Sequence, residues 1–221
     1  TLRRSSAASD VYKRQDDTLS IANIAALAAK DGGTDPTYTT ITDTAAVLGN
    51  NADNAARMNS KTIVISDNAT ATQYRQALTN TTGGGSVSGA VVDTASANLA
   101  AGTDALTGAT SIKLTVQSSD KDFTGTTFLS NVDFDLNGNT GVLFNIADVD
   151  NRTITDSGSG GTYFISDTHA NILTASAHNG TNATDPSQFA KLYNAKEIIV
   201  TDYDATANAG AGAVSYTHLR A

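Results

Sequence analysis

The segment Asp133-Phe134-Asp135-Leu136-Asn137-Gly138 carries residue types at a spacing that can bind a cation. It matches the opening of a calcium-binding loop, in which oxygen ligands at positions 1, 3 and 5 precede a glycine at position 6. Phe144 occupies position 12, where such loops place a bidentate glutamate, so the strongest ligand is missing. A second acidic turn contains Asp148 and Asp150. Calcium is the one cofactor that the sequence suggests, and the candidate ligands are Asp133, Asp135, Asn137, Asp148 and Asp150.

The same segment also fits a half-buried β-strand that ends in a turn. Val132, Phe134 and Leu136 alternate with the two aspartates, which is the pattern of a strand with one buried face. Asn137-Gly138 is a dipeptide that favours a tight turn. The strand and turn are the favoured interpretation, and weak calcium binding at the turn is the alternative.

A catalytic site is not expected. Ser166, Asp167 and His169 are the residue types of a hydrolase triad, but near neighbours in sequence rarely adopt triad geometry. Gly83-Gly84-Gly85 lacks the lysine of a phosphate-binding loop. We therefore expect a protein that is not an enzyme.

The composition is acidic, with 22 acidic residues against 14 basic ones and a net charge of −8. Glu197 is the only glutamate, and the aspartates that make up the rest favour turns and helix N-caps over helix interiors. So acidic a chain repels phosphate groups, and we expect no nucleic-acid partner. No apolar run approaches the ~18 residues that span a bilayer, so no membrane span is expected. The absence of cysteine excludes disulfides and thiolate metal sites.

Internal repeats are the main structural signal. Residues 38–48, 87–99 and 163–173 share a short strand, then Asp-Thr, then an alanine-rich segment that ends in leucine. We expect the aspartates to cap the helix that follows each strand and the leucines to face the core. The aspartates are Asp43, Asp93 and Asp167, and the leucines are Leu48, Leu99 and Leu173.

A second strand motif follows each copy, at residues 62–65, 111–116 and 197–200, and a polar insertion at 178–186 lengthens the last copy. Apolar residues at helical spacing predict helices near residues 21–28 and 71–78. The stretch 130–154 is expected to be purely β. Alternating strands and short helices predict an α/β fold, an elongated solenoid of short parallel strands and short helices. The alternative is an all-β β-helix or β-sandwich array.

The repeats resemble those of large bacterial secreted or surface proteins, most closely at residues 93–99 and 167–173. The resemblance implies an extracellular, adhesin-like and calcium-associated protein whose partners are cell-surface or matrix ligands and neighbouring repeats of the same chain. The expected function is a structural or adhesive repeat segment. A calcium-stabilised repeat module beside a secreted enzyme, or part of a polysaccharide-active β-helix enzyme, is the alternative.

Both ends of the chain resemble a translated sequencing adapter. Residues 10–15 and 214–219 can be encoded by one DNA word read on opposite strands, which is similar to the transposase mosaic-end adapter. We expect residues 1–15 and 214–221 to be adapter-derived and poorly packed. Leaving them out removes five basic residues and one acidic residue, which lowers the net charge from −8 to −12. The native part, 16–213, then contains partial repeat units at about 16–82, 83–160 and 161–213.

Overall fold

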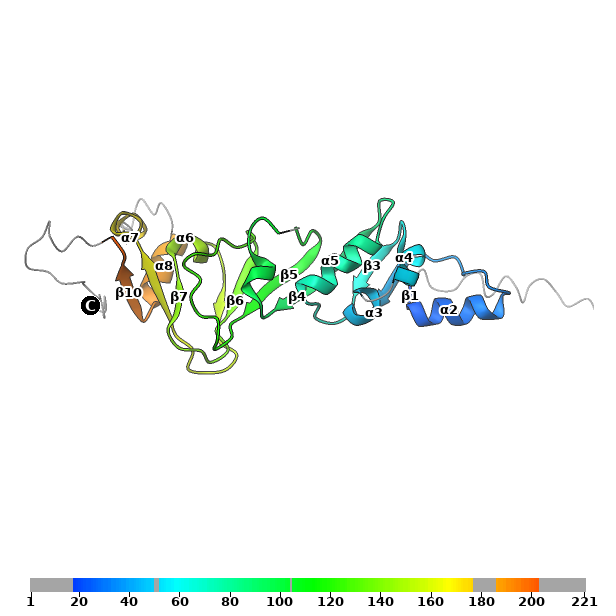
Figure 1. Ribbon diagram of the computed structural model, residues 1–221, viewed down its shortest axis with the longest axis horizontal. Coiled ribbons are helices and arrows are strands. Elements are labelled where there is room, and N and C mark those ends of the chain that lie inside the picture. Colours follow the sequence, from blue (N-terminus) through cyan, green and yellow to red (C-terminus); the bar gives the residue numbers. More distant parts are fainter. Residues whose placement is uncertain (1–17, 50–51, 104, 177–185, 203–221) are drawn as a thin grey trace, which may run out of the picture. The chain divides into compact units, whose positions relative to one another are not determined.

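The computed structural model describes residues 18–49, 52–103, 105–176 and 186–202 (Figure 1). Within them the chain is α/β, as predicted, and it divides into two compact units. Unit 1 contains residues 18–92 and 105–111, and unit 2 contains residues 93–103 and 112–202. The predictions for the tails 1–15 and 214–221, and for residues 178–185 of the insertion, lie outside the described residues.

Short strands alternate with short helices along most of the described chain (Figure 1). The strands are β1 (Thr18–Leu19), β2 (Thr40–Asp43), β3 (Thr62–Ile65), β4 (Ser86–Asp93), β5 (Ala109–Thr115), β6 (Val132–Asp135), β7 (Val142–Phe144), β8 (Ile154–Thr155), β9 (Tyr163–Asp167) and β10 (Glu197–Val200). The helices are α2 (Ile21–Lys30), α3 (Ala45–Gly49), α4 (Ala52–Met58), α5 (Ala71–Asn80), the 3-10 helix η1 (Ser96–Leu99), α6 (Ile146–Val149), α7 (His169–Ser176) and α8 (Pro186–Asn194).

The strands form parallel sheets. A seven-stranded sheet has the order β1-β2-β3-β4-β5-β6-β8, and a three-stranded sheet has the order β10-β9-β7. In unit 1, Ile41 of β2 pairs with Ile63 of β3, and Ile63 pairs with Val87 of β4. Equivalent apolar residues of successive strands therefore stack on one another, and all three are buried in the core.

The helix starts follow local rules of capping. Ser20 accepts a hydrogen bond from the amide of Asn23 at the start of α2. Thr70 and Gln73 form a reciprocal capping box at the start of α5. The predicted apolar face of α5 is partly confirmed, because Ala71 and Tyr74 are buried whereas Leu78 is only half-buried.

Tyr74 joins α5 to the rest of unit 1. Its side chain is fully buried, and its hydroxyl donates to the backbone oxygens of Val87 at 2.8 Å and Thr107 at 3.1 Å. Burial raises the pKa of the hydroxyl to about 12, so the group stays protonated in the folded protein. The hydroxyl thus satisfies two backbone acceptors that are far apart in sequence.

Replacing Tyr74 with phenylalanine is expected to lower the free energy of unfolding by about 1–2 kcal/mol, because the two acceptors lose their donor while the ring is kept. Denaturant unfolding followed by far-UV circular dichroism measures the change. Tyr38→Phe is the matched control, since the Tyr38 hydroxyl donates to one backbone oxygen, that of Arg57 at 3.0 Å. A cost for Tyr74→Phe below that of Tyr38→Phe would contradict the assigned role.

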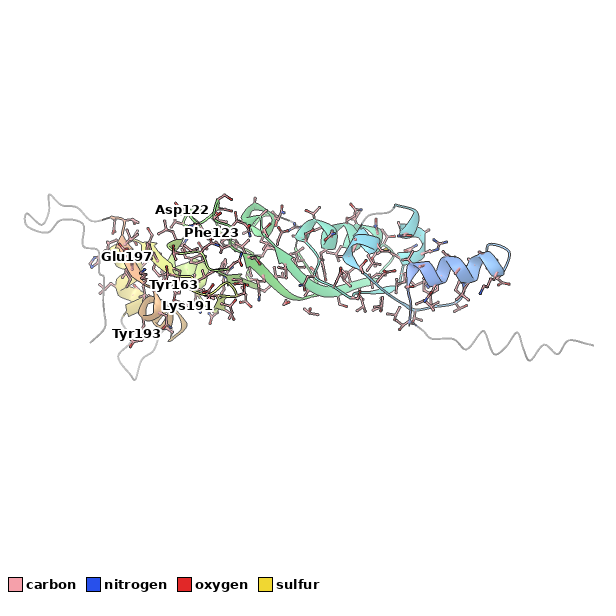
Figure 2. All side chains as sticks on the ribbon, turned by 90° about the horizontal axis from the view of Figure 1, so that it is seen from below. Asp122, Phe123, Tyr163, Lys191, Tyr193 and Glu197 are labelled. Atoms are coloured by element: carbon pink, nitrogen blue, oxygen red, sulfur yellow. The ribbon has the colours of Figure 1, made fainter. Side chains whose placement is uncertain are left out.

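An aromatic cluster fills the core of unit 2. Phe144 lies 4.7 Å from Phe134 and 5.4 Å from Phe123 between ring centroids, and all three rings are buried. Tyr163 packs edge-on against Phe144 at 6.3 Å, and its hydroxyl donates to the backbone oxygen of Lys191 in α8 (Figure 2). The cluster therefore connects β6, β7 and β9 with the segment around Phe123.

Two predictions about elements are wrong. The stretch 130–154 is not purely β, because Ile146–Val149 form the helical turn α6. Leu48 and Leu99 are buried as predicted, but Leu173 is 58 % exposed. The reason is its position on α7, where Ala175 is the residue that faces inward. Two residues are about 200° apart around a helix, so Leu173 points away from the core.

Candidate functional site

Four aspartates at or just after strand ends bond the helix of the preceding repeat. In unit 1, Asp43 at the end of β2 accepts a hydrogen bond from the amide of Ile21, the first residue of α2, at 3.0 Å. Asp67, two residues after β3, accepts one from the amide of Ala45 at 2.7 Å. In both pairs the two residues are 22 positions apart in the sequence. Each carboxylate therefore caps a helix that begins one repeat earlier.

Unit 2 contains the same arrangement. Asp167 at the end of β9 accepts a hydrogen bond from the amide of Ile146, the first residue of α6, at 3.0 Å. Asp202 accepts one from the amide of His169, the first residue of α7, at 2.6 Å. We call these four contacts, made by Asp43, Asp67, Asp167 and Asp202, the inter-repeat caps.

For Asp43 and Asp167, the inter-repeat caps correct the prediction that each aspartate caps only the helix that follows its own strand. Asp93 agrees with the prediction, because it accepts from the amides of Thr94 at 2.8 Å and Ala95 at 3.0 Å, just before η1. Asp43 and Asp167 do accept the amide of the next residue, Thr44 at 2.9 Å and Thr168 at 2.7 Å. Their other carboxylate oxygen reaches across to the neighbouring repeat. Parallel pairing places the end of one strand beside the end of the next, which brings the carboxylate within reach of the neighbouring helix start.

The candidate calcium ligands of the first acidic segment accept hydrogen bonds from backbone amides. Asp133 accepts from Thr153 at 2.7 Å, and Asp135 accepts from Asn137 at 3.0 Å and Ser157 at 2.9 Å. Burial raises the pKa of Asp135, but the bonds from Ser157 and Asn137 outweigh burial and leave the pKa below its ordinary value. The predicted strand is confirmed as β6, and these carboxylates connect β6 to the segment around β8.

Asp156 is a residue that the sequence-based reasoning missed. Its two oxygens accept from the amides of Gly138 and Gly161, each at 2.7 Å. Gly138 has a left-handed φ of 74°, and a Cβ on Gly158 would lie 2.4 Å from the Gly138 nitrogen. The turn at Asn137-Gly138 is therefore stacked directly on the turn that contains Gly158. The available signal in the sequence was an aspartate 18 residues after Gly138, close to one repeat length.

The second acidic segment lies in and after α6. Asp148 is buried, and its Oδ2 has no hydrogen-bond partner among the described residues. Asp150 follows α6 and is half-buried. Within the described ranges, no group of three or more His, Cys, Asp or Glu side chains is placed to hold a metal ion. Calcium binding by Asp133, Asp135, Asn137, Asp148 and Asp150 stays a prediction.

Asp148 makes the stability of unit 2 depend on pH. Burial raises the pKa of its carboxyl to about 6, against the opposing charge of Arg152. A raised pKa means that the protonated form is favoured in the folded state. This stabilisation is complete below the unfolded pKa of about 4 and is lost as the pH rises through about 6.

Replacing Asp148 with asparagine is expected to raise the free energy of unfolding at pH 7 by about 1–3 kcal/mol, because a buried charge is removed. The wild-type chain should lose stability between pH 4 and pH 7, and the variant should lose less. Denaturant unfolding across this pH range measures both. Asp31→Asn, at an exposed position after α2, is the control and should follow the wild type. A variant as pH-dependent as the wild type would contradict the role of Asp148.

Ser166, Asp167 and His169 do not form a triad through the contacts described. The Asp167 carboxylate accepts from the amides of Ile146 and Thr168 and from the side chain of Asn171 at 2.7 Å. His169 is exposed, and its backbone amide bonds Asp202. The Asp167 carboxylate and the His169 backbone amide join neighbouring repeats.

Comparison with protein-family models, with curated proteins and with solved structures finds no match. In the described part of the chain, no helix has the length and apolar character needed to cross a membrane. The site is therefore characterised by its own geometry, in which aspartates at strand ends bond backbone amides of the neighbouring repeat.

Proposed function

We propose that the chain is a structural and adhesive repeat segment of a large extracellular bacterial protein, with no catalysis of its own. The inter-repeat caps carry this proposal. Each one uses a carboxylate to complete the helix of the repeat before it, so that repeats are joined by polar bonds as well as by apolar stacking. This is the arrangement expected of a repeat array in which neighbours stabilise one another.

A solenoid organisation within each unit is part of the proposal. The spacing of three of the inter-repeat caps supports it, since Asp43 and Asp67 each bond a helix start 22 residues earlier and Asp167 bonds one 21 residues earlier. Asp202 bonds one 33 residues earlier, because the polar insertion at 178–186 lengthens its repeat. The buried aromatic cluster and the aliphatic stack give each unit a core that continues from one repeat to the next. Such a segment acts as a spacer and presents lateral surfaces to cell-surface or matrix ligands.

Single-molecule stretching of the full chain, held between two marker domains of known unfolding length, tests the repeat organisation. A repeat of 22 residues releases about 8 nm when extended, at about 3.6 Å per residue. We expect several steps of about this size or small multiples of it. A single step that releases all of the structured residues together would argue against repeats that unfold independently under force, and against the proposed spacer function.

Thermal unfolding in calcium and in chelator separates this function from a calcium-stabilised module. We expect equal midpoints, because backbone amides already occupy the carboxylates of Asp133, Asp135 and Asp167. A higher midpoint in calcium that is lost on replacing Asp148 would favour the calcium-stabilised alternative.

A further inference from the structure

A shallow polar groove lies on unit 2, beside the ends of its parallel strands. Its volume is about 430 Å³. The groove is lined by Thr124, Asn145, Ala147, Ser166, Asp167, Asn171 and Thr201. These residues come from four successive passes of the chain, so the groove crosses the repeats and does not lie within one of them.

The register places three of the lining residues in one row. Asp122 pairs with Leu143, and Leu143 pairs with Phe164. Two residues further along each segment, Thr124, Asn145 and Ser166 therefore occupy equivalent positions. Neighbouring strands are about 4.8 Å apart, so polar side chains recur along the groove at that interval.

The floor of the groove is already occupied by internal bonds. Asp167 is buried, and its carboxylate accepts three hydrogen bonds, from the amides of Ile146 and Thr168 and from the Asn171 side chain. A carboxylate with three donors has little capacity left for a cation or for a proton-transfer role.

The rim presents uncharged groups, of which Thr124 and Asn145 already make internal hydrogen bonds. The Thr124 hydroxyl donates to Asp122 at 2.7 Å, and the Asn145 side chain donates to the Thr124 backbone oxygen and accepts from the amide of Asp148. The hydroxyls of Ser166 and Thr201 make no side-chain hydrogen bond among those found for the described residues, and Thr201 is exposed. The Asn171 amide nitrogen is used by Asp167, which leaves its oxygen as an acceptor. Ala147 is the one apolar side chain of the lining.

We propose that this groove binds a neutral oligosaccharide, an inference that rests on the adhesive part of the proposed function. The open hydroxyls of Ser166 and Thr201 and the Asn171 amide oxygen match the hydroxyls of a sugar, and the groove crosses successive passes of the chain as an extended ligand would. The net charge of −8 opposes anionic ligands. The lining is mixed but more polar than apolar, which suits a sugar better than a lipid or an apolar peptide. The volume lies within the range of small-ligand sites.

Titration of the isotope-labelled full chain with neutral oligosaccharides, followed by amide NMR, tests the groove. The probes are linear hexasaccharides of glucose, of mannose and of N-acetylglucosamine, each added to millimolar concentration. We expect at least one to give saturable shifts at Ser166, Asn171 and Thr201. Ser166→Ala and Thr201→Val should each weaken that binding about 3- to 10-fold, which is the effect of one hydrogen bond.

Thr127→Val is the matched control, because Thr127 is exposed in the same unit and does not line the groove. It should leave the affinity unchanged, and circular dichroism should show all three variants folded. Absence of saturable shifts with every sugar, or shifts that calcium chloride alone reproduces, would overturn the proposal. Sugar binding that neither groove variant weakens would also overturn it. None of these outcomes affects the stretching experiment, so failure of the groove and failure of the repeat organisation are distinguishable.

Discussion

Replacing Asp167 with alanine is expected to lower the free energy of unfolding of unit 2 by about 2–4 kcal/mol. The carboxylate is buried and accepts three hydrogen bonds, at 2.7, 2.7 and 3.0 Å. Alanine leaves the amides of Ile146 and Thr168 without their acceptor, at the starts of α6 and α7. Denaturant unfolding gives the total cost, and hydrogen exchange at these two amides shows whether the loss is local.

Two further variants sharpen the Asp167 experiment. Asp167→Asn keeps the shape of the side chain but places an amide NH₂ next to hydrogen-bond donors. We therefore expect it to lower the free energy of unfolding by less than Asp167→Ala but still measurably. Asp122→Ala removes an exposed aspartate whose carboxylate, among the described residues, accepts hydrogen bonds only from Thr124 in its own turn. This variant should cost about 1 kcal/mol or less. If Asp167→Ala costs no more than Asp122→Ala, the inter-repeat cap does not contribute to stability.

Replacing Phe144 with alanine is expected to lower the free energy of unfolding by about 3–5 kcal/mol, because it opens a cavity in the aromatic cluster of unit 2. The ring is fully buried and contacts Phe123, Phe134 and Tyr163. Phe144→Leu fills most of the space and should cost about 1–2 kcal/mol. Denaturant unfolding measures both.

Phe164 supplies the control within the next strand. It follows Tyr163 in β9, is half-buried on the other face and lies over Gly141. Phe164→Ala should therefore cost clearly less than Phe144→Ala, about 1–2 kcal/mol. Equal costs for the two variants would mean that the aromatic cluster is not the main core of unit 2.

The strands were predictable because they follow from local composition. Thr62–Ile65 and Glu197–Val200 have the same bounds in the sequence pattern and in the structure, since each is a β-branched run between polar residues. The turn at Asn137-Gly138 was predictable for the same reason. The helical turn α6 was not, because four residues are too few to show a helical period.

The candidate site depended on information that local patterns do not contain. The sequence shows that Asp43, Asp93 and Asp167 recur after strands, and it predicts that they cap helices. Which helix each one caps depends on the register between strands about 22 residues apart, and that register is set by packing of the whole repeat. The same limit explains why Asp156 and the groove around Ser166 were not foreseen.

The inter-repeat caps also bear on how such a chain can lengthen. A repeat of 22 residues that is duplicated in the gene, from one strand-end aspartate to the next, brings with it the carboxylate that closes the helix before it. The helix of the new copy is in turn capped by the aspartate of the copy that follows. Duplication or loss of a whole repeat thus preserves the caps between the repeats that remain. An insertion that moves the aspartate away from the strand end breaks a cap. In the proposed repeat array, the bond that joins neighbours would therefore also allow the number of repeats to vary.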